Sequence, residues 1–262
     1  MKRDSSGFTL VELAIVTAAV GLLLGGMLSV LSAQVEQRQF SETQKTLELA
    51  RDALIGYFVA NGRLPCPAVS ASAADTGIEA PVNGGTCTAT YAGGAAVAGY
   101  YPAVTVGLTP TDANGYLLDA YGSRIRYAVT ADPGASHIFT TTNLVKATGI
   151  PNIALPTAGS PYLSVCSTGT ATTGVVNAGA ANATCAAAYK LTDGAIAVIF
   201  SLGKNWATGG GGTDESRNLD NDRVFVSHGM DPAGAANGEF DDVVIWLSPN
   251  VLYNRLIAAG AI

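Results

Sequence analysis

Charged side chains are scarce in this 262-residue sequence, and histidines are scarcer still. Asp, Glu, Lys and Arg make up 13% of the chain, the formal net charge is −6, and there are 2 histidines. Nucleic-acid binding depends on neutralisation of phosphates by Lys and Arg. An acidic chain without a basic run is therefore not expected to bind nucleic acid.

Enzyme signatures are missing as well. The sequence contains no G-x-S-x-G, H-E-x-x-H or C-x-x-C motif, and no Lys-Ser/Thr follows the glycine run at 209–212. An isolated histidine lacks the positioned nucleophile that catalysis needs, so His137 and His228 are expected to be surface or strand residues. The chain is not expected to be an enzyme.

A long apolar run near the N-terminus is the strongest feature that is present. From Phe8 to Ala33, which is 26 residues, the only charged side chain is Glu12. A helix over this run would span roughly 39 Å, more than the ~30 Å hydrocarbon core of a bilayer. A secretory signal peptide has its small residue after the apolar run, whereas Gly7 precedes it here. The run therefore predicts a retained, single-pass membrane anchor with Lys2 and Arg3 on the cytoplasmic side.

Glu12 needs a partner, because a carboxylate in a membrane segment is costly. Cleavage after Gly7 would leave a cationic amine on Phe8, and in a helical filament Glu12 of one subunit could neutralise the Phe8 amine of the next. The alternative is an ordinary anchor whose glutamate reaches back to the membrane interface.

The segment GFTLVELAIV, residues 7–16, resembles the cleavage and methylation signature of type IV prepilins and type II secretion pseudopilins. This resemblance implies that Gly7 precedes the cleavage site, that Phe8 becomes the N-methylated first residue, and that Glu12 is needed for methylation and assembly. The implied partners are a prepilin peptidase, other pilin or pseudopilin subunits in a homo- or hetero-filament, and the bacterial inner membrane. The globular part would lie in the periplasm or on an extracellular filament.

Segments 53–65, 119–129, 200–205 and 239–246 extend the resemblance to the major secretion pseudopilins, although this chain also carries large Ala/Gly/Thr-rich inserts. The expected function is a structural subunit of a type IV pilus-like filament, and a type II secretion pseudopilin is the leading hypothesis. The alternative is a minor type IV pilin that acts as a filament tip or adhesive binding module.

The expected fold is α+β, with a long N-terminal helix packed on an antiparallel sheet and long loops held by disulfides. The helix should have a transmembrane first half at 8–33 and an amphipathic second half at 34–62 that stops at Asn61-Gly62. It follows a leader at 1–7 and precedes a globular domain at 63–262, which should end in a short helix at 248–260. Strands are predicted at 98–106, 124–130, 137–142, 162–166, 195–202, 223–227 and 242–247.

Four cysteines fall in pairs within the two inserts, at about 69–99 and 150–188 or close beside them. In an oxidising compartment an even number indicates disulfides. Four cysteines allow three connectivities. We predict the one in which each cysteine bonds to its nearest neighbour in sequence, since each bridge then closes one irregular insert. The predicted bridges are Cys66–Cys87 and Cys166–Cys185, and the alternative for each insert is a low-complexity linker.

Eight of the chain's 20 carboxylates lie between residues 214 and 242, where there are only two arginines. Calcium accepts six to eight oxygen ligands in flexible geometry, and the corresponding loop of the major secretion pseudopilins binds calcium. The sequence therefore predicts a Ca²⁺ site in this loop, and a solvated acidic loop is the alternative. The predicted side-chain ligands are Asp220, Asp222, Asp241 and Asp242.

Overall fold

A computed structural model of the chain describes residues 9–69, 77–82, 87, 96–130, 139–140, 162–169, 172–173, 184–208, 211–220 and 222–260. At 24, 26–33, 96–98, 172–173 and 184 it describes the backbone alone. The chain divides into two compact units, Met1–Ser41 and Glu42–Ile262. Helix α1 (Leu10–Asn61) contributes residues to both.

In the first unit, α1 begins with a reciprocal pair of hydrogen bonds between Thr9 and Glu12. The Glu12 carboxylate accepts from the backbone N–H and the hydroxyl of Thr9, both at 2.9 Å, and the Glu12 N–H donates to the Thr9 hydroxyl at 3.3 Å. This is a capping box, which satisfies backbone donors that a helix start leaves free. Across the residues that the structure describes, no helix has both the length and the apolarity needed to cross a membrane.

In the second unit, α1 is amphipathic, as its spacing predicts. Leu47, Ala50, Leu54 and Phe58 are at most 2% exposed and recur at intervals of three and four, so they share one helix face. The helix ends at Asn61, and Gly62 then adopts a left-handed conformation with φ of 69° while its N–H bonds to the Phe58 carbonyl at 2.7 Å. The predicted stop at Asn61-Gly62 is confirmed.

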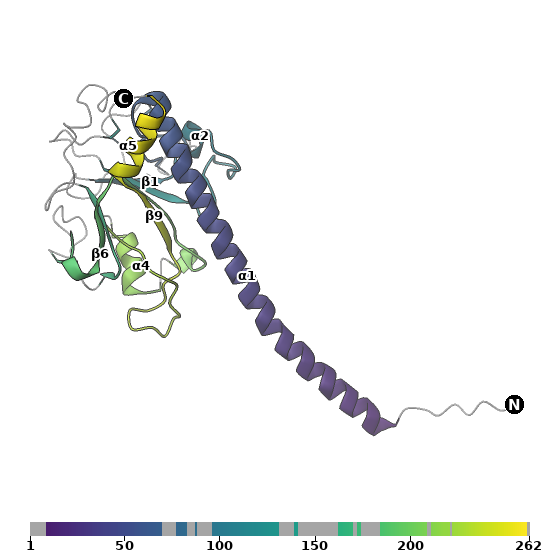
Figure 1. The fold of residues 1–262 in the computed structure, drawn as a ribbon. Coiled ribbons are helices and arrows are strands. Elements are labelled where there is room, and N and C mark those ends of the chain that lie inside the picture. The colour runs from purple at the N-terminus through teal and green to yellow at the C-terminus, as the bar shows by residue number, and fades with distance from the viewer. Residues whose placement is uncertain are drawn as a thin grey trace. The chain divides into compact units, whose positions relative to one another are not determined.

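The main sheet has four strands, all paired antiparallel, in the order β1-β2-β7-β9. Its strands are β1 (Ala96–Tyr100), β2 (Arg126–Thr130), β7 (Ala197–Ser201) and β9 (Val243–Leu247). Figure 1 labels its two outer strands, β1 and β9. Every residue of β7 is buried, as expected for a central strand of a sheet covered on both faces. The predicted α+β class with an antiparallel sheet is confirmed.

A second sheet corrects the expectation of one antiparallel sheet. It has the order β6-β3-β8, from β6 (Lys190–Ala195), β3 (Leu163–Cys166) and β8 (Val224–Val226), and β3 pairs with β8 in parallel. Phe225 of this sheet packs on Phe200 of the main sheet with ring centroids 5.4 Å apart. The two sheets thus share a core. A two-stranded ladder joins β4 (Thr172–Thr173) to β5 (Thr184–Cys185).

Some predicted element boundaries are wrong. The strand predicted over 98–106 ends at Tyr100, because Pro102 has no N–H for a ladder and helix α2 (Ala103–Val106) follows it. Of the strand predicted at 137–142, only 139–140 lies within the described residues, where it forms a turn. Besides α2, the described residues form three short helices that the sequence did not predict: η3 (Ala187–Tyr189), η4 (Trp206–Thr208) and α4 (Thr213–Asn218). The C-terminal helix α5 (Pro249–Ala258) is present as predicted, and the Ser248 hydroxyl caps it by accepting a hydrogen bond from the Val251 N–H.

Both predicted disulfides are present. Cys66 bonds to Cys87 and Cys166 bonds to Cys185, with Cα atoms 5.4 and 5.5 Å apart. All four cysteines are at most 3% exposed. Each bridge closes about twenty residues, so chain-entropy arguments give about 3 kcal/mol of stabilisation per bridge.

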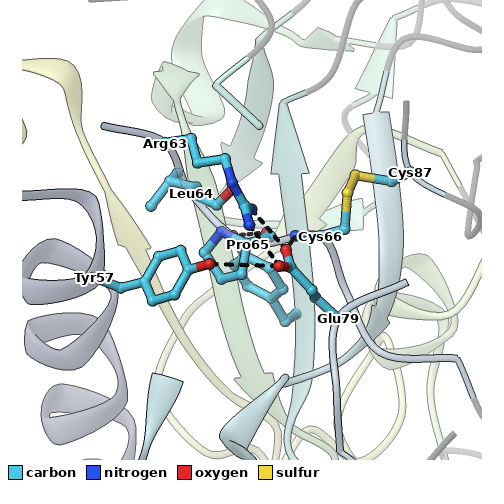
Figure 2. Close-up of a disulfide and its surroundings, with 8 residues drawn as sticks. Tyr57, Arg63, Leu64, Pro65, Cys66, Glu79 and Cys87 are labelled. Atoms are coloured by element: carbon cyan, nitrogen blue, oxygen red, sulfur yellow. Dashed lines mark hydrogen bonds and ion pairs between the residues drawn. A yellow bond between two sulfur atoms is a disulfide. The ribbon is translucent and has the colours of Figure 1, made fainter. Parts of the chain in front are cut away.

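A buried ion pair also holds the Cys66–Cys87 loop (Figure 2). The Arg63 guanidinium donates to both oxygens of Glu79, at 2.6 and 2.7 Å, and the two residues are 6% and 4% exposed. The backbone N–H of Cys66 and the hydroxyl of Tyr57, which comes from α1, donate to the same carboxylate at 3.1 and 3.4 Å. Glu79 therefore connects the end of α1, the disulfide and the loop between the cysteines.

Candidate functional site

The acidic loop between β7 and β9 is ordered around helix α4. The helix begins after Gly212, where the Cβ atom of any other residue would clash with the carbonyl oxygens of Asn237 and Glu239. The Thr213 N–H donates to the Asn237 carbonyl at 2.7 Å. Because a glycine allows this close approach, α4 lies against the segment that leads into β9.

Three carboxylates converge where α4 meets the start of β9. Glu215, Asp241 and Asp242 each offer an oxygen within 4.8 Å of the others, and the three residues are 1%, 4% and 4% exposed. Two oxygens on opposite sides of a calcium ion, each at about 2.4 Å, would be about 4.8 Å apart. The spacing of this acidic triad thus fits a calcium-sized cation.

Glu215 is held rigidly within the triad. The Asn205 amide donates to both of its oxygens at 3.1 and 3.0 Å, the Asp241 N–H donates at 2.8 Å, and the Gly211 N–H donates to Oε2. Three donor groups from separate segments make four hydrogen bonds to this carboxylate and fix its position without a cation.

Asp241 lacks this support. Neither of its oxygens has a hydrogen-bond partner of normal geometry among the described residues, although both are buried. Burial and the nearby charges of Glu215 and Glu239 raise the pKa of Asp241 to about 6, which Lys204 and the Asn205 N–H offset only in part. A buried polar group without a partner costs about 1–3 kcal/mol or more when charged, so this carboxylate is the strongest indication of a ligand in the triad.

The Asp242 side chain accepts one hydrogen bond among the described residues, from the Asn218 side-chain amide to Oδ2 at 2.7 Å. Asn218 is fixed in turn by Val226 of β8, whose N–H and C=O bond to its side chain at 2.8 and 3.2 Å. Burial raises the pKa of Asp242 well above its usual range. The two aspartates of the triad therefore receive fewer hydrogen bonds than Glu215, and burial raises the pKa of both.

Of the four predicted metal ligands, the structure brings Asp241 and Asp242 together and places Asp220 and Asp222 outside the triad. Asp220 pairs with Arg217 at 3.1 Å, and Asp222 accepts from the Val224 N–H at 2.6 Å as β8 begins. Burial raises the pKa of Asp222 to about 7, and the charge of Asp220 adds to this rise. Both therefore shape the turn between α4 and β8.

The third member of the triad, Glu215, was not among the predicted ligands, because no signal in the sequence indicated α4. Its neighbour Asp214 points elsewhere, accepting from the Gly169 N–H at 2.6 Å, the Asn237 amide at 3.1 Å and His228 Nε2 at 3.1 Å. Asp214 thus ties the loop to the turn after β3.

At the other predicted site, Gly7 and Phe8 lie outside the described residues, and Glu12 lies in the capping box that starts α1. Comparisons of the chain with protein-family models, with curated proteins and with solved structures gave no match.

Proposed function

We propose that this protein is a structural subunit of a type IV pilus-like filament, most simply a type II secretion pseudopilin, that a prepilin peptidase processes between Gly7 and Phe8. The observation that carries the proposal is the order of features along the chain. The prepilin-like segment GFTLVELAIV leads directly into α1, which continues to Asn61 and joins a disulfide-bonded α+β unit.

The anchor in this proposal is the apolar run 8–33, inserted in the bacterial inner membrane with the unit 42–262 in the periplasm or on an extracellular filament. Two buried disulfides support an extracytoplasmic location, since such bonds persist in oxidising compartments. The apolar run is long enough to span the bilayer, and Lys2 and Arg3 would keep the N-terminal end of the anchor on the cytoplasmic side.

Glu12 would act in assembly through its carboxylate. In the isolated chain this group binds Thr9, so the helix start is already organised when the peptidase frees the Phe8 amine. In the filament, the same carboxylate would accept from the Phe8 amine of a neighbouring subunit, which stabilises both charges in a membrane environment.

The acidic triad would bind one Ca²⁺, with Glu215, Asp241 and Asp242 as side-chain ligands. Support comes from the convergence of three carboxylate oxygens within 4.8 Å of one another and from the buried oxygens of Asp241, which lack a hydrogen bond of normal geometry among the described residues. A bound cation would join α4 to the start of β9 and would stabilise the loop that carries both.

Intact mass spectrometry of the membrane-purified chain, with and without a co-expressed prepilin peptidase, tests the central proposal. The expected result is loss of residues 1–7 and gain of one methyl group, only when the peptidase is present. Gly7→Val should block processing, whereas the control Ser5→Val should not. A Gly7→Val chain that is still shortened by seven residues would refute the proposal.

A further inference from the structure

A cleft of about 540 Å³ lies in the second unit, at the end of the main sheet where β2 begins and β7 ends. It is lined by aromatic, cationic and apolar side chains, among them Tyr100, Asp112, Arg124, Arg126, Leu202 and Trp206. Trp206 is 44% exposed, so part of its ring is open to solvent. None of these residues belongs to the acidic triad or to the processing segment.

The two arginines of the cleft differ in the partners that their guanidinium groups have within the protein. Arg124 pairs with Asp112 through Nε and Oδ2 at 2.9 Å, and its guanidinium also lies 4.3 Å from the centre of the Tyr116 ring. The backbone N–H groups of Asn114 and Tyr116 fix Asp112 in turn. The charge of Arg124 is therefore compensated within the protein.

Arg126 has no carboxylate partner among the described residues. Its guanidinium lies 4.1 Å from the centre of the Tyr100 ring, and its Nε is buried without a hydrogen-bond acceptor. A guanidinium presents five donors in a planar fork that matches a carboxylate. The Tyr100 face supports one side of the group and leaves its donors for an external acceptor.

We propose that this cleft binds a carboxylate-bearing ligand, with Arg126 as the anchor for the carboxylate and Trp206 as a face for an adjacent apolar group. One uncompensated guanidinium suits a single negative charge. A phosphate dianion would bring a second negative charge, and the other arginine that lines the cleft, Arg124, is already paired with Asp112. The inference does not depend on the filament proposal.

A small organic acid and an acidic side chain of a protein can both supply this chemistry, so the test uses one probe for each. Saturation-transfer NMR on the full chain in detergent micelles would follow phenylacetate and a blocked peptide, acetyl-Gly-Glu-Phe-Gly-amide. The neutral analogue 2-phenylethanol and the dianion phenyl phosphate serve as matched probes. We expect saturable binding of at least one carboxylate probe and weaker binding of both matched probes.

Arg126→Gln should weaken binding about tenfold or more, because a charged hydrogen bond is lost. Arg255→Gln, which removes an exposed charge on α5, should leave binding unchanged. If Arg126→Gln fails to fold, Trp206→Ala at an exposed position provides the test and should also weaken binding. Binding of the peptide alone, or of phenylacetate alone, would identify the source of the carboxylate. No saturable binding of either probe, equal affinity in Arg126→Gln, or tighter binding of phenyl phosphate would each overturn the proposal.

Discussion

Removal of Glu79 should destabilise the second unit more than any exposed ion pair can. Arg63 would lose two short hydrogen bonds to Glu79 while staying 6% exposed, and the Cys66 N–H and the Tyr57 hydroxyl would lose their acceptor as well. Breaking one side of a buried ion pair typically costs about 3–5 kcal/mol. For a unit of this size that free energy corresponds to a fall of roughly 6–20 °C in Tm.

The assay is denaturant unfolding of the oxidised full chain in micelles, followed by the fluorescence of Trp206 and Trp246. Glu79→Ala and Arg63→Ala should each lower the free energy of unfolding by about 3–5 kcal/mol. The double variant Arg63→Met/Glu79→Leu should recover most of the loss, because apolar side chains of similar volume leave no buried charge.

The control is the more exposed pair between Lys190 and Asp193, whose N–O distance of 2.8 Å is nearly as short. Asp193→Ala should cost less than about 1 kcal/mol. If Glu79→Ala costs no more than Asp193→Ala, or if the apolar double variant is as unstable as the single variants, burial does not determine the contribution of this pair.

Three further outcomes are expected. Millimolar calcium should raise Tm in physiological salt, because a cation at a hundredfold excess over its Kd stabilises the folded state by about 2.7 kcal/mol. Asp241→Ala should abolish the rise in Tm and Asp220→Ala should keep it. An unchanged midpoint from chelator to calcium would reject the site. In chelator, the free energy of unfolding should fall as pH rises through about 6 to 7. The pKa values of Asp241 and Asp222 are raised in the folded state, so the folded protein keeps protons that the unfolded chain has already released, and this stabilisation is lost as pH rises. Asp222→Asn should reduce the pH dependence, and a flat profile from pH 5 to 8 would contradict the prediction. The Glu12→Ala variant should still insert in the membrane but should no longer be incorporated into filaments. The Thr9→Ala variant, which breaks the capping box and keeps the carboxylate, should still assemble. Equal incorporation of Glu12→Ala and the unmodified chain would refute the pairing of Glu12 with the Phe8 amine.

Features governed by local chemistry could be predicted from the sequence. The amphipathic spacing of α1 and the Asn61-Gly62 stop follow from helix geometry, and Ser248 with Pro249 marks the start of α5. The disulfide pairing followed from the two inserts, since bridges near in sequence close each irregular segment.

Features that depend on distant contacts could not be predicted. β6 has the sequence KLTDGA, which is too polar to indicate a strand, and it forms because β3 offers a ladder beside it. Glu215 becomes part of the acidic triad only because Gly212 lets α4 approach the segment before β9. The predicted ligand pair Asp220 and Asp222 is close in sequence, but its hydrogen bonds serve the α4–β8 turn.

Segment 203–208 links two places that were described separately. The Asn205 side-chain amide donates to both oxygens of Glu215 of the triad, and the next residue, Trp206, lines the cleft that contains Arg126. Coupling between two binding sites is reciprocal. If a cation at the triad tightens carboxylate binding tenfold, which is about 1.4 kcal/mol, the carboxylate must tighten cation binding by the same factor. One short segment would then let the protein respond to two ligands jointly, and the full response to either ligand would be measurable only when the other is bound.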